Sequence, residues 1–406
     1  MQARSGKLPS RVASVLFPFG WGNIAKLQII YFLSTLYVYI PVGTLYLRSR
    51  GLSYLQINSL WGIIVFTMFL AEVPTGIIAD RIGHQRAVQL ALGFQLLGEV
   101  IYLFTRGYPG FVLAAIAGGL GFAFGSGCVE ALVTDELQSM EREDDMSQAM
   151  GGIEASQRLA NLIAFSLSGL VVSSLTLQQF ITAVAITAAM VGLGFLLTFS
   201  LDAPQHDRPG EAITGLAALK QGLRLLRTNR VFAVLALISL LTIPFRDYLG
   251  SLSQPYFVGA GVQPIWFGLA LSIASGLSVL GARYAYLLEA RLGKRWSLLL
   301  AAISPGLAYL AMAAIGHKVG AVAVFCLAYG ATSLRSPPMS ARLNAHISSA
   351  NRATVLSLIS MLSGLYVAGM GLIFGRIADA SVTVALAAMG AVVLGGSVIA
   401  ALAVRE

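Results

Sequence analysis

One short polar stretch decides the fold, and it reads Gly76-Ile77-Ile78-Ala79-Asp80-Arg81-Ile82-Gly83-His84-Gln85-Arg86. It separates two apolar runs, which lie near residues 55–79 and 87–105. Each run has the length of a helix that crosses a bilayer, since such a helix needs about 20 mostly apolar residues. The charges are therefore confined to a turn between two membrane-spanning helices, and the pattern predicts a helical membrane protein.

The same alternation of apolar runs and short polar turns continues on both sides of this turn. One longer polar stretch, residues 201–230, interrupts it, and within that stretch residues 212–230 have the spacing of an amphipathic surface helix. We therefore predict an all-α membrane protein of twelve transmembrane helices, in two pseudo-symmetric six-helix halves, residues 1–200 and 231–406. The predicted spans lie near 27–47, 55–79, 87–105, 109–134, 150–174, 178–200, 231–258, 264–288, 296–316, 320–340, 353–375 and 380–403.

The composition excludes most soluble classes of protein. Of the 406 residues, 57% are hydrophobic and 11% are charged, whereas soluble domains average about 45–50% apolar and about 25% charged residues. A soluble enzyme, a nucleic-acid-binding protein and a disordered chain are thereby excluded. The two cysteines and four histidines show no metal-ligand spacing, and no GxxxxGK[ST] phosphate-binding loop is present. We therefore expect no cofactor, no metal and no nucleic-acid partner, and we expect a monomer surrounded by lipid.

Positive charge is distributed unevenly among the predicted loops. Most of the 27 Lys and Arg residues lie in the termini, the 201–230 linker and the loops on the same side as the 76–86 turn. The opposite loops hold only Arg48, Arg50, Arg106, Lys318 and Arg376. Because cytoplasmic loops carry an excess of Lys and Arg, both termini and the linker are predicted to be cytoplasmic. We expect a multi-pass protein of the cell membrane.

The two predicted halves carry similar turns. Arg81-Ile82-Gly83 follows the second apolar run, and Arg291-Leu292-Gly293 follows the eighth. Weak internal repeats of this kind are typical of secondary transporters, whose substrate sites lie between the repeats near the middle of the membrane. The repeat therefore favours a transporter.

The whole chain resembles the major facilitator superfamily, in its six-plus-six spans and in its first polar turn. The turn fits that superfamily's signature, Gly-x-x-x-Asp-Arg-x-Gly-x-x-Arg, at Gly76, Asp80, Arg81, Gly83 and Arg86. The resemblance implies a cytoplasmic gate that stabilises the outward-facing state. In such a gate Gly76 would allow close helix approach, Asp80 would bind a helix N-terminus, and the arginines would pair with carboxylates such as Asp135. The alternative is that Arg81 and Arg86 only set the orientation in the membrane.

Two departures from the resemblance concern the substrate. Drug–proton antiporters of this superfamily usually carry an arginine in the fourth span, but residues 114–127 contain none. They also carry a Gly-Pro signature in the fifth span, whereas residues 159–172 contain no proline. Both departures weaken the drug-antiporter interpretation and leave the expected fold unchanged.

Polar side chains within the spans are candidates for substrate binding, because ionisable groups at membrane depth are costly and usually functional. Glu154, Arg158 and Asn161 form one stripe of the fifth span. Arg158 could bind an anionic group of a substrate, or it could form a structural pair with Glu154. A further candidate for substrate contact is Arg246. In the first span Tyr31, Tyr37 and Tyr39 could line an amphipathic cavity, or they could serve aromatic packing.

Asp247 is the first candidate for proton coupling. It lies in the seventh span, which lines the central cavity in the family that the chain resembles, and nearby Pro244 removes a backbone hydrogen bond and loosens that span. The alternative is a static ion pair. Glu99 in the third span and Glu130 in the fourth are further candidates, although Glu99 could instead hydrogen-bond a neighbour in its neutral form.

These features lead to one main hypothesis of function. We expect a secondary active transporter that works by alternating access, is coupled to protons and exports an amphipathic small molecule. The alternatives are an uptake permease for a small metabolite and a lipid flippase on the same fold. We do not expect an enzyme, because the spans hold no cluster of nucleophilic or metal-binding side chains.

Overall fold

The computed structural model describes residues 19–20, 22–202, 230–340 and 352–403, and every regular element in these ranges is helical. The N-terminal half contains α2 (Asn23–Ser34), α3 (Gly43–Ser49), α4 (Tyr54–Ile82), α5 (His84–Phe104), α6 (Tyr108–Gly125), α7 (Cys128–Ser139), α8 (Met146–Val171) and α9 (Leu177–Thr198), with short 3-10 turns η1 (Ile40–Val42) and η2 (Glu143–Asp145). The C-terminal half contains α11 (Arg230–Leu241), α12 (Arg246–Gly259), α13 (Ile265–Ala314), α14 (Lys318–Ala331), α16 (Arg352–Ala380) and α17 (Val382–Ala403). The predicted linker helix over 212–230 lies outside the described residues, apart from Arg230.

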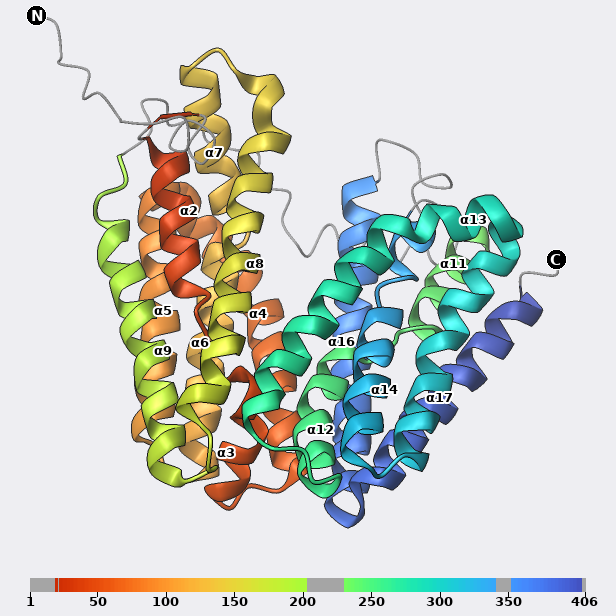
Figure 1. The fold of residues 1–406 in the computed structure, drawn as a ribbon. Coiled ribbons are helices and arrows are strands. Elements are labelled where there is room, and N and C mark those ends of the chain that lie inside the picture. Colours follow the sequence, from red (N-terminus) through yellow and green to blue (C-terminus); the bar gives the residue numbers. More distant parts are fainter. Residues whose placement is uncertain (1–18, 21, 203–229, 341–351, 404–406) are drawn as a thin grey trace, which may run out of the picture.

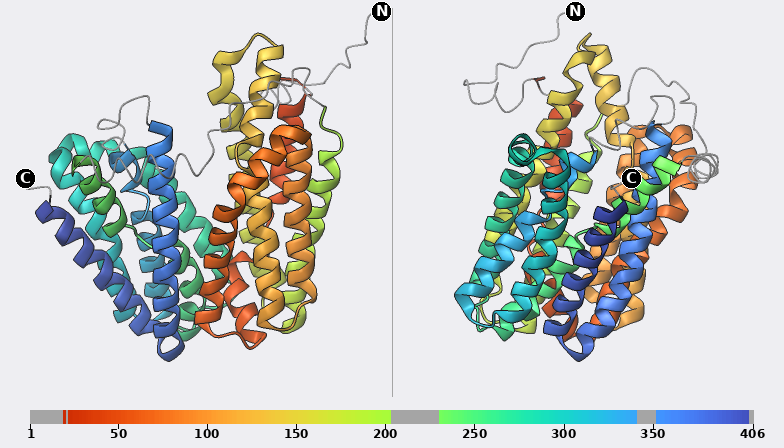
Figure 2. Two further views of the ribbon diagram at one scale, coloured as in Figure 1. Left: turned by 180° about the vertical axis from the view of Figure 1, so that it is seen from behind. Right: turned by 90° about the vertical axis from the view of Figure 1, so that its right-hand side faces the viewer.

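The two halves are helical bundles that stand side by side (Figure 1). They meet at one end and diverge toward the other, and the view from behind shows the same arrangement (Figure 2). We call the end that carries Ser53 and Ser381 the closed end, and the end that carries Gly83 and Gly293 the motif end. The all-α, two-half architecture predicted from the sequence is confirmed.

Nine segments of the described chain are long and apolar enough to cross a bilayer. They include all of α4, α5 and α9, the α6–α7 segment Tyr108–Ser139, and two parts of α13. The other predicted spans correspond to α8 and to two interrupted pairs, α2 with α3 and α11 with α12. Their interruptions explain why length and composition alone do not single these pairs out.

Both repeated turns have the same backbone conformation. Gly83, between α4 and α5, has φ 88°, and Gly293, which separates two helical parts of α13, has φ 76°. A positive φ of this size is readily adopted only by glycine. The glycine in each Arg-x-Gly sequence therefore lets one span end and the next begin almost at once.

The first, fourth and seventh spans are interrupted, although the sequence predicted them as continuous runs over 27–47, 109–134 and 231–258. Residues 35–42, here called the span-one break, separate α2 from α3, and residues 242–245, the span-seven break, separate α11 from α12. Gly127, with φ 76°, separates α6 from α7. Each of the first two breaks contains a proline, Pro41 or Pro244, and a proline cannot donate a backbone hydrogen bond. Broken helices of this kind are tolerated at membrane depth where they line a cavity or are buried in protein.

The halves are packed tightly at the closed end, where α4 contacts α16 and α8 contacts α13. A Cβ atom added to Gly375 would lie 2.8 Å from Cα of Leu55, and one added to Gly364 would lie 3.1 Å from Cγ1 of Val65. Gly76, which the sequence predicted as the point of close approach, has no atom within 4 Å of such a Cβ. Here α4 meets α16 at its other end, so close approach at Gly76 stays a prediction for the state in which the motif end is closed.

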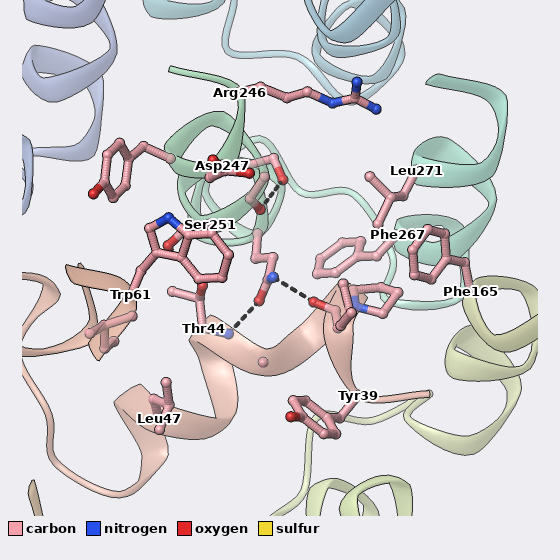
Figure 3. A pocket seen from close by; sticks show the side chains of 18 of the residues that line it. Tyr39, Thr44, Leu47, Trp61, Phe165, Arg246, Asp247, Ser251, Phe267 and Leu271 are labelled. Atoms are coloured by element: carbon pink, nitrogen blue, oxygen red, sulfur yellow. Dashed lines mark hydrogen bonds between the residues drawn. The ribbon is translucent and has the colours of Figure 1, made fainter. Parts of the chain in front are cut away.

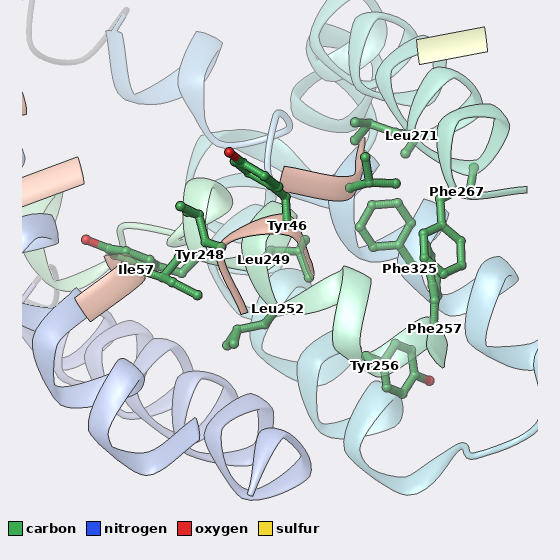
Figure 4. Packing of buried hydrophobic residues seen from close by; sticks show 14 of the residues in the cluster. Tyr46, Ile57, Tyr248, Leu249, Leu252, Tyr256, Phe257, Phe267, Leu271 and Phe325 are labelled. Carbon is green, nitrogen blue, oxygen red and sulfur yellow. The ribbon is translucent and has the colours of Figure 1, made fainter. Parts of the chain in front are cut away.

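A buried apolar cluster joins the two halves at the closed end (Figure 4). Tyr46 of α3 and Ile57 of α4 belong to the same cluster as Leu249 and Leu252 of α12 and Phe325 of α14. Burial of large aromatic and aliphatic side chains stabilises such contacts by about 1.5–3 kcal/mol for each fully buried side chain, relative to water. The closed end is thus a shared core of both halves.

Candidate functional site

A cavity of about 440 Å³ lies between the halves, beside both breaks. Figure 3 shows its walls, to which the aromatic rings of Tyr39, Trp61, Phe165 and Phe267 contribute. Its uncharged polar lining includes Asn58, Asn161, Ser251 and Gln254, and its charged lining residues are Arg246 and Asp247. A cavity of mostly apolar wall with a few polar groups is the usual form of a small-molecule site.

Arg246 and Asp247 are brought to the cavity by the span-seven break. Because α12 begins at Arg246, Asp247 lies in the first turn of that helix, where free backbone N–H groups favour a negative charge. The guanidinium of Arg246 lies over the ring of Tyr329, 4.2 Å from its centroid, and its Nη1 lies 3.5 Å from Oγ of Ser333. Asp247 is exposed, and none of the described residues pairs with its carboxylate. The alternative of a static ion pair between Asp247 and a further residue is therefore not observed in the described ranges.

Two side chains from elsewhere in the C-terminal half hold the span-seven break open. Nε of Arg335 donates to Oγ1 of Thr242 at 2.7 Å, and its Nη2 donates to the backbone oxygen of Ser239. The hydroxyl of Tyr309 donates to the backbone oxygen of Pro244. Arg335 thus places a positive charge at the C-terminal end of α11, where the helix dipole favours a cation. The break thus has a negative side chain at the N-terminal end of α12 and a positive one at the C-terminal end of α11, as the helix dipoles favour.

The span-one break is held from the opposite half by Gln254 of α12. Oε1 of Gln254 accepts the backbone N–H of Thr44 at 2.7 Å, and its Nε2 donates to the backbone oxygen of Ile40 at 2.9 Å. Figure 3 shows both bonds as dashed lines. One amide side chain therefore satisfies a donor and an acceptor that the interrupted helix leaves free.

Glu99 lies behind the cavity wall and is 7% exposed. The hydroxyl of Tyr39 donates to its Oε1 at 3.1 Å, while its Oε2 is buried and has no hydrogen-bond partner among the described residues. The ring of Tyr39 stacks on that of Tyr102 with 5.1 Å between centroids, and both rings line the cavity. Glu99 is thus one side chain away from the cavity.

The fifth-span stripe is only partly brought to the cavity. Asn161 lines it, whereas the side chains of Glu154 and Arg158 are 66% and 65% exposed and do not. Nη2 of Arg158 lies 3.4 Å from Oε2 of Glu154, an i,i+4 pair on α8. The structure therefore separates Asn161 from the two charged residues with which the sequence grouped it.

Three further candidates lie away from the cavity lining. Tyr31 packs against a second buried cluster near Cys128, and the hydroxyl of Tyr37 accepts from Nε2 of Gln95 at 2.7 Å. Glu130 is exposed in the first turn of α7. Of the three span-one tyrosines Tyr31, Tyr37 and Tyr39, Tyr39 lines the cavity.

In the described ranges the gate motif forms no ion pair with the C-terminal half. Asp80, Arg81 and Arg86 are exposed, and no ion pair joins them to another side chain of the described ranges. The predicted pairing of the arginines with Asp135 is not observed; instead Nδ1 of His84 lies 3.8 Å from Oδ2 of Asp135. Asp135 belongs to the same half as the motif, on α7, and its carboxylate faces His84. The halves are apart at this end (Figure 1), so the motif meets no helix of the C-terminal half.

Sequence reasoning missed Gln254 and Asp379, which both bridge the halves. Oδ1 of Asp379 on α16 accepts the backbone N–H of Tyr54 at 2.6 Å. A signal was present, since each is a polar side chain inside or at the edge of an apolar run. Their partners are backbone groups far away in the sequence, and no local pattern indicates those.

Comparison with known proteins gives one family and several relatives. A sequence model of the Major Facilitator Superfamily matches residues 27–371. The inner membrane transport protein YajR of Escherichia coli is 25% identical over 246 residues, which is 60% of this chain and 51% of that protein. The multidrug efflux pump Tap of Mycobacterium tuberculosis is 26% identical over 278 residues, 65% of this chain and 64% of that protein. The matches thus span about half to two thirds of these relatives.

Solved structures are similar to this chain over its whole fold, although their sequences are not. The nucleoside transporter NupG, as its D323A mutant, superposes with a TM-score of 0.77 at 15% identity, covering 94% of this chain and 98% of that one. A bacterial homologue of the lysosomal transporter Spinster, in an inward-facing and unoccupied conformation, gives 0.72 at 16% identity and covers 98% of both chains. At such identities the likeness concerns the fold alone.

Proposed function

Because this chain belongs to the major facilitator superfamily of membrane transporters, we propose that it exports an amphipathic small molecule in exchange for protons. Family membership makes it a multi-pass transporter and not an enzyme, as the sequence predicted. The observation that carries the finer proposal is the cavity between the halves, with aromatic walls and one unpaired carboxylate at Asp247.

The lining of the cavity fits an amphipathic ligand. Aromatic rings offer apolar and cation–π contacts, and the side-chain amides of Asn58, Asn161 and Gln254 offer both donors and acceptors. Few polar groups need to lose water when an apolar molecule enters such a site, so binding does not depend on one fixed set of hydrogen bonds. This chemistry supports a range of related substrates.

Asp247 is the proposed coupling group for the proton. A carboxylate in a mostly apolar cavity is costly to leave ionised and dry, so its protonation depends on the water that reaches it. The break at 242–245 lets the two parts of the seventh span move separately, which changes that hydration between states. A carboxyl group that binds its proton more tightly in one state biases the equilibrium between the states.

The shape supports an inward-facing state if the motif end is cytoplasmic, as the charge distribution predicts. The halves meet at the closed end and the gate motif is disengaged. In the proposed cycle, residues 1–200 and 231–406 rock about the 201–230 linker, and Asp80, Arg81 and Arg86 engage when the motif end closes. The protein works as a monomer in the cell membrane, with both termini cytoplasmic.

Export is supported by the similarity to Tap, a multidrug efflux pump that is 26% identical. Uptake of a small metabolite and lipid flipping remain the competing outcomes for the experiment. Purified full-length protein is reconstituted in vesicles of phosphatidylethanolamine and phosphatidylglycerol with an imposed pH gradient. Ethidium serves as the first cationic probe, and neutral and zwitterionic dyes follow.

The proposal expects a pH gradient to drive probe accumulation against its concentration gradient, in the direction opposite to proton flow. Vesicles without protein and vesicles with Asp247→Asn are the controls. Accumulation in the same direction as the proton flow would make the protein a symporter. Movement of labelled lipid without dye transport would make it a flippase.

A further inference from the structure

Glu99 is a buried acid with an unusual set of neighbours. Its Oε1 accepts the hydroxyl of Tyr39 at 3.1 Å, and its Oε2 has no partner among the described residues although it is fully buried. No cation of the described residues forms an ion pair with it. An ionised carboxylate in that position would lack both a counter-charge and water.

The groups that face Glu99 from neighbouring elements are uncharged. Tyr37 and Tyr39 come from the span-one break and Tyr102 comes from α5 itself. Of the helices packed against the middle of α5, α6 has only Tyr108 as a titratable side chain, which is bonded to Ser59, and α9 has none. The neutral, protonated acid is therefore the form that fits this site, with Oε1 as the carbonyl oxygen and the hydrogen on Oε2.

The span-one break connects this acid to the contact between the halves. Tyr39, which bonds Glu99, is followed directly by Ile40, whose backbone oxygen accepts from Gln254 of the opposite half. The same two-residue stretch thus touches the buried acid on one side and the C-terminal half on the other. A movement that exposes Glu99 also disturbs the bond to Gln254.

We propose that Glu99 is a proton-binding site, separate from Asp247, whose protonated form stabilises the closed end through Tyr39 and the span-one break. When the Oε2–H bond breaks, the proton passes to water that enters from the cavity. The remaining charge requires that water to stay, so Tyr39 moves away and Ile40 is drawn from Gln254. Loss of the proton therefore favours opening of the closed end.

This inference rests on the proposed function and deepens it. Glu99 would bind a proton while the closed end is open, and the protonated form would then favour closing of that end. That order suits an exporter. The site itself is tested without any substrate, so its failure and the failure of the transport proposal are distinguishable.

The first test is infrared difference spectroscopy on the full-length protein in phosphatidylethanolamine–phosphatidylglycerol vesicles at neutral pH. We expect the carbonyl stretch of a neutral carboxyl group in the wild type, its loss in Glu99→Gln and its shift in Tyr39→Phe. Asp247→Asn should retain it. If Glu99→Gln removes no such band, Glu99 is ionised and the proposal is wrong.

The second test measures the distance between spin labels at R106C and K318C, two exposed positions at the closed end. Arg106 lies in the turn between α5 and α6, and Lys318 is the first residue of α14. Both native cysteines are replaced by alanine. As pH rises, we expect the wild type to populate a longer distance and Glu99→Gln to do so at least about tenfold less, the equivalent of about 1.4 kcal/mol.

Tyr108→Phe is the matched control, because Tyr108 lies at the closed end of α6 but bonds Ser59. It should follow the wild type, whereas Tyr39→Phe should open at lower pH. A Glu99→Gln protein that opens with pH as the wild type does would overturn the link to the closed end. If the infrared and distance measurements give the expected results but no probe is transported, the export proposal is wrong and the proposal for Glu99 stands.

Discussion

The carboxylate of Asp379 accepts the backbone N–H of Tyr54 at 2.6 Å, across the boundary between the two halves. Its second oxygen lies 3.3 Å from the backbone nitrogen of Leu55. Tyr54 is the first residue of α4, where backbone N–H groups are free and the helix dipole is positive. A charge on α16 therefore closes a helix end of the other half, as the resemblance implied for Asp80 at the opposite end.

Asp379→Asn should weaken this closure. The amide keeps an acceptor but loses the charge, which is worth about 1–2 kcal/mol at a partly buried helix N-terminus, or a shift of about five- to thirtyfold in the open population. The R106C–K318C distance would report the shift. Asp202→Asn is the control, because Asp202 pairs with Lys26 at 2.5 Å at the motif end. Equal distances in Asp379→Asn and the wild type would show that the contact contributes nothing to closure.

Gln254→Leu should destabilise the span-one break. The substitution leaves the N–H of Thr44 and the carbonyl of Ile40 without their partner, and a buried unsatisfied group costs about 1–3 kcal/mol. We expect a lower thermal midpoint and faster amide exchange over residues 40–45. Gln178→Leu, at an exposed position of α9, should change neither. Unaltered exchange at Thr44 in Gln254→Leu would mean that another group satisfies the break.

The sequence predicted the features of this fold that depend on local composition. Span positions follow from hydropathy, and the turns at Gly83 and Gly293 follow from their Arg-x-Gly sequences. The breaks were not predicted as gaps, because a proline such as Pro41 loosens a helix but does not fix how far it unwinds. In the span-one break that extent is set by Gln254, which bonds backbone groups of Ile40 and Thr44 more than two hundred residues away. Long-range pairs of this kind leave no trace in a local pattern.

The sequence likewise predicted some residues of the candidate site and not the contacts that position them. Asp247 and Arg246 were identified because charge inside a span is rare, and both line the cavity. Adjacent residues of a helix do not face each other, so their separation is expected. The ring of Tyr329 beside Arg246 and the helix start at Arg246 were not predicted, since they depend on a distant residue and on the break. Tyr31, Tyr37 and Tyr39 were chosen from residue type alone, and of these Tyr39 lines the cavity. Residue type does not indicate which side of an interrupted helix faces the cavity.

Asp80→Asn should shift the balance further toward the state seen here. In this structure Asp80 has no partner among the described residues, so its loss harms only the state in which the motif end is closed. Labelling of S126C, an exposed position between α6 and α7, should increase. Asp144→Asn in the nearby acidic turn serves as the control. Wild-type labelling together with wild-type transport in Asp80→Asn would remove the gating role.

Arg158 should contribute little to stability. Its pair with Glu154 is exposed and 3.4 Å long, and exposed pairs are worth about 0–1 kcal/mol. A double-mutant cycle of Arg158→Ala and Glu154→Ala should therefore give a coupling below about 1 kcal/mol in thermal unfolding. If Arg158 instead binds an anionic substrate, Arg158→Lys should raise the KM for anionic probes only, because a point charge replaces a two-pronged donor. Recovery of transport in the double variant would argue for a structural pair.

Asp247→Asn should separate substrate binding from proton coupling. The amide imitates the protonated acid and retains a polar group in the first turn of α12, so the cavity keeps its shape. Binding of a neutral probe should stay within about twofold of the wild type, a difference of about 0.4 kcal/mol. Exchange of probe across the membrane without a gradient should also continue, since both states remain accessible.

Transport driven by a pH gradient should be lost in the same variant, because no proton can be released from the amide and the two states no longer differ in proton affinity. Accumulation of probe in vesicles, measured at equal protein density, tests this directly. Glu130→Gln is the matched control, since Glu130 is exposed on α7 and does not line the cavity. Should Asp247→Asn accumulate probe as well as the wild type, the coupling proton must bind elsewhere. Glu99, one side chain behind the cavity wall, would then be the first group to test as the sole coupling site.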